Sequence, residues 1–459
     1  MRSPPHAFNA RLALSSALRC AAILVCAAAL ALAAASNAAA DDSLTADHAP
    51  PLDDPVARLQ KRIDSGAVKL DYDAKHGYLE SVLEHLEMPA SSQMLVFSKT
   101  SFQRSLLGPR TPRALYFNDD VYVGFVHGGP VLEIATIDSK QGTVFYTLTQ
   151  EKSAKPRFKL QTDDCLQCHQ SSVTRDIPGL LMRSVYPDMD GEPILPAGTF
   201  VSTDRSPLSQ RWGGWYVTGA SGRQHHMGNT VCEDEDHADQ TDFSRGSNVT
   251  SLAKKVDTAP YLRGTSDIVA LMVLEHQQNM HNLLSQAAHD VRLAVRDSRE
   301  LNKALGEPID QFSESTLHRI QSTCEPVVKG LLFSHEARLT DLVKGTSEFA
   351  REFAARGPMD GKGRSLRQFD LNRRLFKYPC SYLIYSEQFD GLPAEAKKYI
   401  YRRLWEILNG DDTTGAYAHL IDEDRAAILA ILWDTKKDLP AYWKPQAADS
   451  RTKPKTQLK

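Results

Sequence analysis

The stretch VLEIATIDSKQGTVFYTLTQ, residues 131–150, decides the fold class of this chain. On both sides of its central DSKQG, apolar side chains recur at every second position and are mostly Val, Ile, Phe and Tyr. A period of two is typical of a β-strand with one buried face, and Asp and Gly favour a turn between two strands. Upstream, the segments MLVFSK, ALYFND and VYVGFV repeat the pattern. We therefore predict an antiparallel sheet between residues 93 and 161.

Past Pro260 the period changes to that of a helix. Residues 266–295, SDIVALMVLEHQQNMHNLLSQAAHDVRLAV, carry apolar side chains at three- and four-residue spacing, which predicts a long amphipathic helix. The same spacing predicts helices at 394–409 and 422–435, and two short helices at 54–65 and 76–87. The expected class is α+β, with an antiparallel β-containing domain followed by a mainly α-helical domain.

The first forty residues have the features of a secretory signal. They hold Arg2, Arg11 and Arg19 and no acidic residue, then an apolar run from 20 to 35, and three alanines that end at Ala40. This run is shorter than the roughly 20 residues that span a bilayer, and the alanines fit a signal-peptidase site. We expect cleavage after Ala40 and a periplasmic protein whose mature chain has no membrane span.

The expected organisation has five parts. They are a signal peptide (1–40), a linker with short helices (41–90), a β-rich domain (91–255), a helical domain (256–445) and a disordered tail (446–459). Across all 459 residues, 42% are hydrophobic and 24% are charged, as in ordinary globular proteins. The net charge of −3 gives no electrostatic reason to expect nucleic acid as a partner.

The chemistry is concentrated in DDCLQCHQ, residues 163–170, where Cys165, Cys168 and His169 form C-x-x-C-H. Two thiols at this spacing can add to the two vinyl groups of one porphyrin, and the adjacent imidazole can then bind its iron. The motif resembles that of c-type cytochromes. The resemblance implies one covalent haem c in the 91–255 domain, with Cys165 and Cys168 as its thioether cysteines and His169 as the proximal iron ligand.

Three other readings of the two cysteines stay open. They are a thioredoxin-like dithiol, half of a zinc site and a plain disulfide. A thioredoxin site should open a helix within a βαβ pattern, and a zinc site needs a second pair of ligands. Neither feature is visible in the sequence.

Downstream, IPGLLM places Pro178 and Gly179 where cytochromes often have a loop behind the proximal histidine. A backbone carbonyl there could accept the ring N–H of His169 and raise its basicity. The segments RALYFNDDVYVGFVHGG and FKYPCSYLIYSEQFD, taken with the motif, resemble large, single-haem bacterial cytochromes of uncharacterised function. That resemblance covers most of the chain and implies no substrate.

For the sixth iron position, GASGRQHHMGN offers three neighbouring ligand types about 57 residues beyond His169. We expect His226 as the distal ligand, with Met227 as the alternative and Met182 as a third choice. A His–His pair gives a lower reduction potential than His–Met.

Several other side chains are candidate neighbours of the haem. Apolar ring walls and cationic partners for propionates would suit four residues, namely Trp212, Trp215, Arg183 and Arg211. Core aromatics with surface arginines would explain them equally well. The helix at 266–295 bears a polar stripe, which is either a solvated face or a buried network; it comprises Glu275, Asn279, Asn282 and Gln286, flanked by His276 and His281.

Three cysteines remain outside the motif and the signal. Cys324 and Cys380 both lie in apolar surroundings in the helical half, so they are the disulfide pair we expect, with Cys232 as a free thiol. The acidic run beside Cys232, EDED, lacks the spacing of a calcium loop and is interpreted as a solvated loop.

The expected function is periplasmic electron transfer by an exported c-type cytochrome. Its partner would be a redox protein or a small-molecule electron donor or acceptor. The alternative is a haem enzyme, such as a peroxidase or a small-molecule oxidoreductase, with an exchangeable iron site. A third reading is a binding protein in which haem is a structural staple or a sensor. Iron coordination distinguishes them, since an enzyme needs an open position and an electron carrier usually has two protein ligands.

Overall fold

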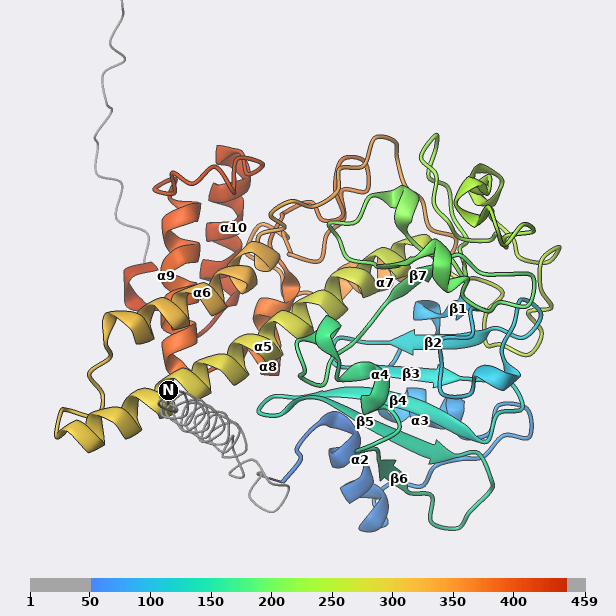
Figure 1. Ribbon diagram of the computed structural model, residues 1–459, viewed down its shortest axis with the longest axis horizontal. Coiled ribbons are helices and arrows are strands. Elements are labelled where there is room, and N and C mark those ends of the chain that lie inside the picture. Colours follow the sequence, from blue (N-terminus) through green and yellow to red (C-terminus); the bar gives the residue numbers. More distant parts are fainter. Residues whose placement is uncertain (1–50, 444–459) are drawn as a thin grey trace, which may run out of the picture. The chain divides into compact units, whose positions relative to one another are not determined.

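The computed structural model, which describes residues 51–443, contains a seven-stranded antiparallel sheet (Figure 1). The predicted signal peptide, the first ten residues of the predicted linker segment (41–50) and the tail after Trp443 lie outside the described residues. The strand order is β6-β5-β4-β3-β2-β1-β9, so each of the first six strands pairs with its neighbour in sequence. The strands are β1 (Met94–Val96), β2 (Arg113–Phe117), β3 (Val121–Phe125), β4 (Val131–Asp138), β5 (Gly142–Thr149), β6 (Phe158–Leu160) and β9 (Trp215–Tyr216). With the helices described below, the sheet confirms the predicted α+β class.

The turn between β4 and β5 shows why residues 131–150 fold as a hairpin. One carboxylate oxygen of Asp138 accepts hydrogen bonds from the backbone N–H groups of Lys140 and Gln141, both at 2.8 Å. Gly142 then adopts a left-handed φ of +82°, which glycine tolerates without a steric penalty. The eight-residue register that follows pairs Val131 with Thr149.

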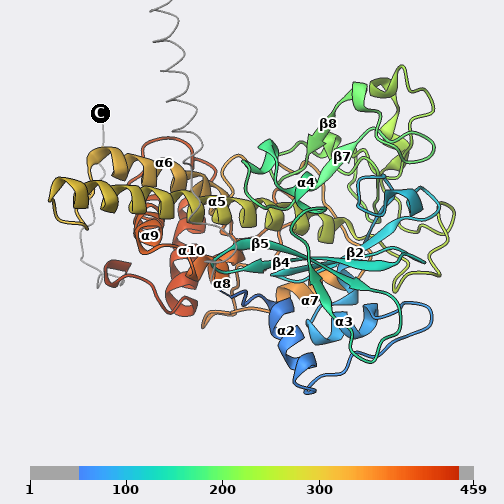
Figure 2. The same cartoon turned by 60° about the horizontal axis from the view of Figure 1, so that its bottom comes forward.

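The two faces of the sheet meet different elements, as Figure 2 shows. One face packs on α2 (Pro55–Asp64) and α3 (Leu79–His85), and there Tyr146 donates a hydrogen bond to Asp54 at 2.8 Å. The opposite face, called here the α5 face, lies under α5 (Ile268–Leu305) and α4 (Leu166–His169). Side chains alternate along each strand, so neighbouring residues face different layers.

Helix α5 is the longest element, with 38 residues, and it begins where Asp267 caps its first N–H groups, those of Val269 and Ala270. It ends at Gly306, which takes the left-handed conformation of a C-terminal cap. The amide of Gln277 joins the helix to the sheet by donating to the Tyr122 hydroxyl at 2.7 Å. Within residues 51–443, no helix combines the length and the apolar content needed to cross a bilayer.

Part of the α5 face remains incompletely covered. The paired residues Leu115, Gly124 and Glu133 lie side by side on β2, β3 and β4, and Ala135 follows on the same face. Leu115 and Ala135 are only partly buried. Gly124 itself is buried, with the side chains of Arg113 and Leu115 next to it. The partly buried apolar surface of this strip therefore comes from Leu115 and Ala135.

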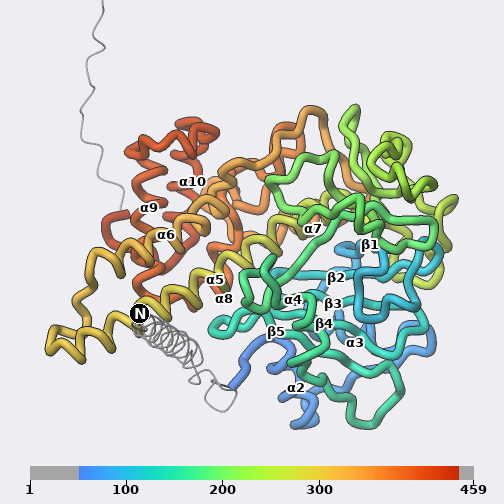
Figure 3. The backbone as a smooth tube through the Cα atoms, viewed as in Figure 1, coloured from blue at the N-terminus to red at the C-terminus, as the bar shows by residue number. Residues whose placement is uncertain are grey.

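The loop-rich segment that follows β6 doubles back beside β1 and the start of α5, as Figure 3 shows in green. It contains a short hairpin of β7 (Arg183–Val185) and β8 (Thr199–Val201). It also contributes β9, which pairs with β1 at the edge of the main sheet. The segment is therefore fastened to the sheet at its far edge, and this positions the residues discussed below.

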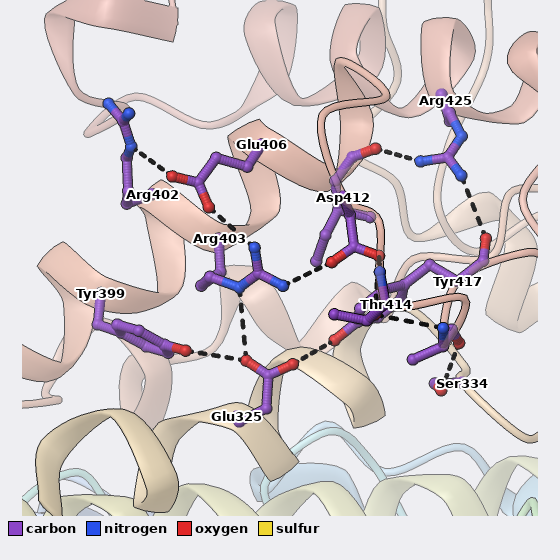
Figure 4. Close-up of polar contacts among 12 residues, drawn as sticks. Glu325, Ser334, Tyr399, Arg402, Arg403, Glu406, Asp412, Thr414, Tyr417 and Arg425 are labelled. Atoms are coloured by element: carbon purple, nitrogen blue, oxygen red, sulfur yellow. Dashed lines mark hydrogen bonds and ion pairs between the residues drawn. The ribbon is translucent and has the colours of Figure 1, made fainter. Parts of the chain in front are cut away.

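The remaining helices follow α5 in the chain. They are α6 (Glu314–Leu331), α7 (Phe349–Ala355), α8 (Glu387–Asp390), α9 (Ala394–Leu408) and α10 (Asp422–Thr435). Figure 4 shows how Arg403 on α9 joins α6 to the loop after α9. Its guanidinium lies 2.8 Å from both Glu406 and Asp412 and 3.6 Å from Glu325. Tyr399 and Tyr417 donate to the two oxygens of Glu325.

Replacing Arg403 by Met is expected to lower the free energy of unfolding by about 2–3 kcal/mol, because three partly buried carboxylates then lose their shared cation. Although burial opposes ionisation, the bonds from Arg403 hold the pKa values of Glu406 and Asp412 below their usual range. Groups with lowered pKa values stabilise the fold above their unfolded pKa and lose that contribution as the pH falls. The difference between wild type and variant should therefore narrow below about pH 4. Chemical denaturation monitored by circular dichroism measures it.

The control is Arg402→Met on the same turn. Arg402 also bonds Glu406, but its side chain is 57% exposed, so the change should cost less than about 1 kcal/mol. Equal losses in the two variants would contradict the structural role given to Arg403.

Candidate functional site

The C-x-x-C-H residues form one turn of helix directly after β6. The backbone N–H of His169 donates to the carbonyl of Cys165 at 3.1 Å, which closes the turn. Residues three and four apart on a helix share one side, so the turn presents Cys165, Cys168 and His169 together. Both thiols are free; Cys168 is exposed and Cys165 is partly buried.

The imidazole of His169 is held from behind by the predicted loop. Its Nδ1 lies 2.9 Å from the carbonyl oxygen of Gly179, so Nδ1 carries the hydrogen and donates it. In the neutral ring the lone pair is then on Nε2, which makes no hydrogen bond within the described residues. Burial lowers the pKa of His169 and favours this neutral form. The predicted carbonyl partner is therefore confirmed as Gly179.

Asn282 on α5 fixes the loop that carries this carbonyl. Its Oδ1 accepts from the N–H of Leu180 at 2.8 Å, and its Nδ2 donates to the carbonyl of the same residue at 2.7 Å. A Cβ on Gly179 would lie 2.8 Å from that Oδ1, which is closer than real Cβ contacts. Because Gly179 has no side chain, Asn282 of α5 can bond Leu180, the residue next to the carbonyl that accepts the hydrogen bond from His169.

An ion pair on the α5 face lies beside the motif. Arg113 on β2 contacts Glu133 on β4 at 2.5 Å, and Ser101 and Gln103 also donate to Glu133. Burial opposes the charge on Glu133, but Arg113 holds its pKa below the usual range. Electrostatic coupling to Glu133 shows that both Cys165 and His169 lie near this pair.

The pKa of Cys165 differs from that of the reactive cysteine in a redox-active dithiol. Burial, with a contribution from Glu133, raises the pKa of Cys165 to about 11. Thioredoxin-like centres need a cysteine whose pKa is lowered, because the thiolate is the reactive form. The thioredoxin-like interpretation is therefore disfavoured.

A zinc site at the motif is not supported either. Among the described residues, one group of three His, Cys, Asp or Glu side chains has all its ligand atoms within 4.8 Å, and it lies elsewhere. That group is Asp73, His76 and Glu80, where the Nδ1 of His76 already bonds Glu80 at 2.8 Å.

His226, the first choice for the distal ligand, is buried in the loop that follows β9. Its Nδ1 accepts from the backbone N–H of Gly228 at 3.1 Å, and its ring meets Trp212 edge-on at 5.2 Å. Burial lowers the pKa of His226 to about 4, so the ring is neutral and its hydrogen is on Nε2. Neither nitrogen offers a free lone pair in this arrangement, and within residues 51–443 no hydrogen bond or ring contact joins His226 to His169.

The two methionine candidates are also in the core. Met227 accepts a hydrogen bond at its sulfur from Ser184 of β7 at 3.6 Å. Met182 is 2% exposed, and its carbonyl accepts from the N–H of Ser202. The geometry thus assigns no distal ligand.

The four suggested haem neighbours separate into two groups. Arg211 forms a buried ion pair with Glu275 of α5 at 2.8 Å, and Trp212 is fully buried. These two residues belong to the core. Trp215 donates its indole N–H to the carbonyl of Arg183 at 2.8 Å. The side chain of Arg183 is exposed and close enough to His169 to affect its titration.

Most side chains of the polar stripe on α5 bond residues of the loop-rich segment and hold it against the helix. Besides Glu275 and Asn282, Asn279 contacts Asp204 at 3.4 Å, whereas Gln286 bonds Asp290 on its own helix. The flanking histidines are fully buried and bond elements after α5 or in the sheet; His276 bonds Ser381 at 2.7 Å, and His281 bonds the carbonyl of Asp119 and the amide of Gln388. Of the four stripe residues, Glu275 is fully buried and the other three are partly exposed, so the stripe combines a buried network with a partly solvated face.

The predicted disulfide is wrong. Cys324 and Cys380 are free, fully buried thiols, and Cys232 is also free. The N–H of Ser381 donates to the carbonyl of Leu331, which places Cys380 near the end of α6, seven residues after Cys324. Seven residues span about 10 Å along a helix, whereas bridged cysteines have Cα atoms within about 7 Å. A shared apolar environment did not bring the two thiols together. The acidic run after Cys232 is exposed, as expected of a solvated loop.

Gly179→Ala is expected to lower the free energy of unfolding by about 1–3 kcal/mol, because the added Cβ collides with the Asn282 amide and with Thr174. The matched control is Gly264→Ala, where the nearest atom to a new Cβ is 3.5 Å away. Thermal unfolding of both variants measures the difference. An equal effect in both would contradict the close approach of α5 to the loop.

No family model, curated protein or solved structure matches the chain. The interpretation of the site therefore depends on the geometry of its own residues.

Proposed function

We propose that this chain is an exported c-type cytochrome that carries one covalent haem and transfers electrons in the periplasm. The observation that carries the proposal is the state of His169 in the C-x-x-C-H turn. Its Nδ1–H is engaged by the Gly179 carbonyl at 2.9 Å, so its Nε2 lone pair is available to a metal. When bound, the haem would supply reversible one-electron oxidation of its iron.

The residues around the turn fit such a group. Cys165 and Cys168 are reduced and lie on one turn, as thioether formation with a single porphyrin requires. The half-covered strip of the α5 face offers apolar surface beside the motif through the partly buried Leu115 and Ala135. The exposed Arg183 is the remaining cation suited to a propionate among those suggested by the sequence.

The protein's own contribution is to hold the imidazole and tune its basicity. The Gly179 carbonyl keeps the hydrogen on Nδ1 and makes Nε2 a stronger donor, which favours the oxidised state of a bound iron. Asn282 keeps that carbonyl in place through Leu180. The buried Arg113–Glu133 pair adds no net charge next to the ring.

The proposal is tested by producing the full chain with a c-type attachment system and measuring a pyridine haemochrome spectrum and the intact mass. We expect a two-thioether spectrum and the added mass of one haem. Cys165→Ser should retain at most one thioether, and His169→Ala should leave little holo-protein. Cys232→Ser is the control, because that thiol lies outside the motif. A wild-type chain without added mass would reject the proposal.

A second function, a haem enzyme with an open iron position, is favoured by one specific observation. His226 and Met227 are engaged with Gly228 and Ser184, and neither is presented to His169. If this arrangement persists in the holo-protein, carbon monoxide should bind the reduced form and shift its Soret band without denaturant. A reduced spectrum that carbon monoxide leaves unchanged would instead support electron transfer with two protein ligands. His226→Ala would then change a low-spin spectrum to a high-spin one if His226 is the second ligand.

A further inference from the structure

A cleft of about 200 Å³ lies between α5 and the segment that follows the motif. Its apolar walls include Leu180, Met182 and Leu283. Hydroxyl and amide side chains line the rest, and no Asp or Glu is among the lining residues. The cleft is thus neutral to positive and partly apolar, and its size suits a molecule of about ten non-hydrogen atoms.

Two residues that line the cleft each carry a buried polar atom that has no hydrogen-bond partner in the described part of the chain. These atoms are the hydroxyl oxygen of Ser202, a residue that is 3% exposed, and the Oε1 of Gln278. Buried polar atoms are nearly always paired, because an unpaired one costs free energy. The two atoms therefore mark where a ligand with hydrogen-bonding groups would be stabilised.

One of the lining residues, Arg175, carries a positive charge. Arg175 has a left-handed backbone, and its exposed guanidinium makes no ion pair or side-chain hydrogen bond within the described residues. A guanidinium in this state can bind a carboxylate through two hydrogen bonds. Arg205, also exposed, belongs to the next loop and is not a lining residue.

We propose that this cleft binds a small organic carboxylate that also carries a hydroxyl group. Arg175 would hold the carboxylate, Ser202 and Gln278 would bond the hydroxyl, and the apolar walls would contact the carbon skeleton. The proposal does not require haem. It adds to the proposed function a ligand site that shares Leu180 and Asn282 with the support of His169.

The test is calorimetric titration of the full chain with 4-hydroxybenzoate, which has a carboxylate, a hydroxyl and ten non-hydrogen atoms. We expect one binding site. Benzoate and 4-hydroxybenzyl alcohol, which lack the hydroxyl and the carboxylate respectively, should each bind about tenfold more weakly. No measurable binding of 4-hydroxybenzoate would overturn the proposal.

Variants locate the binding. Arg175→Gln should weaken 4-hydroxybenzoate about tenfold and leave the affinity for the alcohol unchanged, whereas Arg205→Gln should change neither. Ser202→Ala removes one oxygen and keeps the packing, so it should reduce the preference for 4-hydroxybenzoate over benzoate in a folded protein. Equal losses in Arg175→Gln and Arg205→Gln would overturn the assignment. Because the titration works on chain with or without haem, its failure is distinguishable from failure of the proposed function.

Discussion

The polar side chains that α5 carries into the interior must find hydrogen-bond partners, and this requirement organises the site. A buried amide or carboxylate without a partner costs more than a paired one gains. The partners here are backbone groups and side chains of the loop-rich segment after β6. Asn282 takes both backbone groups of Leu180, and Glu275 takes Arg211. The loop behind the motif is thus bonded to a helix that is far away in sequence.

The buried pair of Arg211 and Glu275 shows that burying charged groups costs free energy even when they are paired. Burial raises the pKa of Glu275 to about 7 even though Arg211 lies 2.8 Å away. Within residues 51–443, one oxygen of Glu275, one oxygen of Asp204 and the Nδ1 of His276 have no hydrogen-bond partner. Such a cluster adds little net stability compared with apolar packing. It does restrict the loop at 202–211 to one position against α5.

Local periodicity predicted the fold because each element leaves a repeating pattern in sequence. The hairpin of β4 and β5 has its alternation and its Asp–Gly turn, and α5 begins and ends at residues with capping chemistry. The motif and its carbonyl partner were also predictable, since Gly179 lies only ten residues from His169. A short loop limits the partners that an imidazole can reach.

The contacts that were missed join residues distant in sequence. Nothing local marks Asn282 as the clamp of Leu180, because an amide on a half-polar stripe suits water equally well. The Arg113–Glu133 pair depends on the register of three strands, which periodicity alone does not give. The disulfide prediction failed for a related reason, since apolar surroundings describe where a thiol is and not which thiol faces it.

Leu180 and Asn282 are 102 positions apart in the sequence, and this separation also sets an order of events. A chain that emerges with its N-terminus first exposes the motif long before α5 is complete. During that interval the N–H and carbonyl of Leu180 lack Asn282 as their partner, so α5 does not yet hold the loop behind His169. Docking of α5 then closes the interval. The sequence separation of Leu180 and Asn282 therefore determines when the contact forms during synthesis, and the fold determines where it forms.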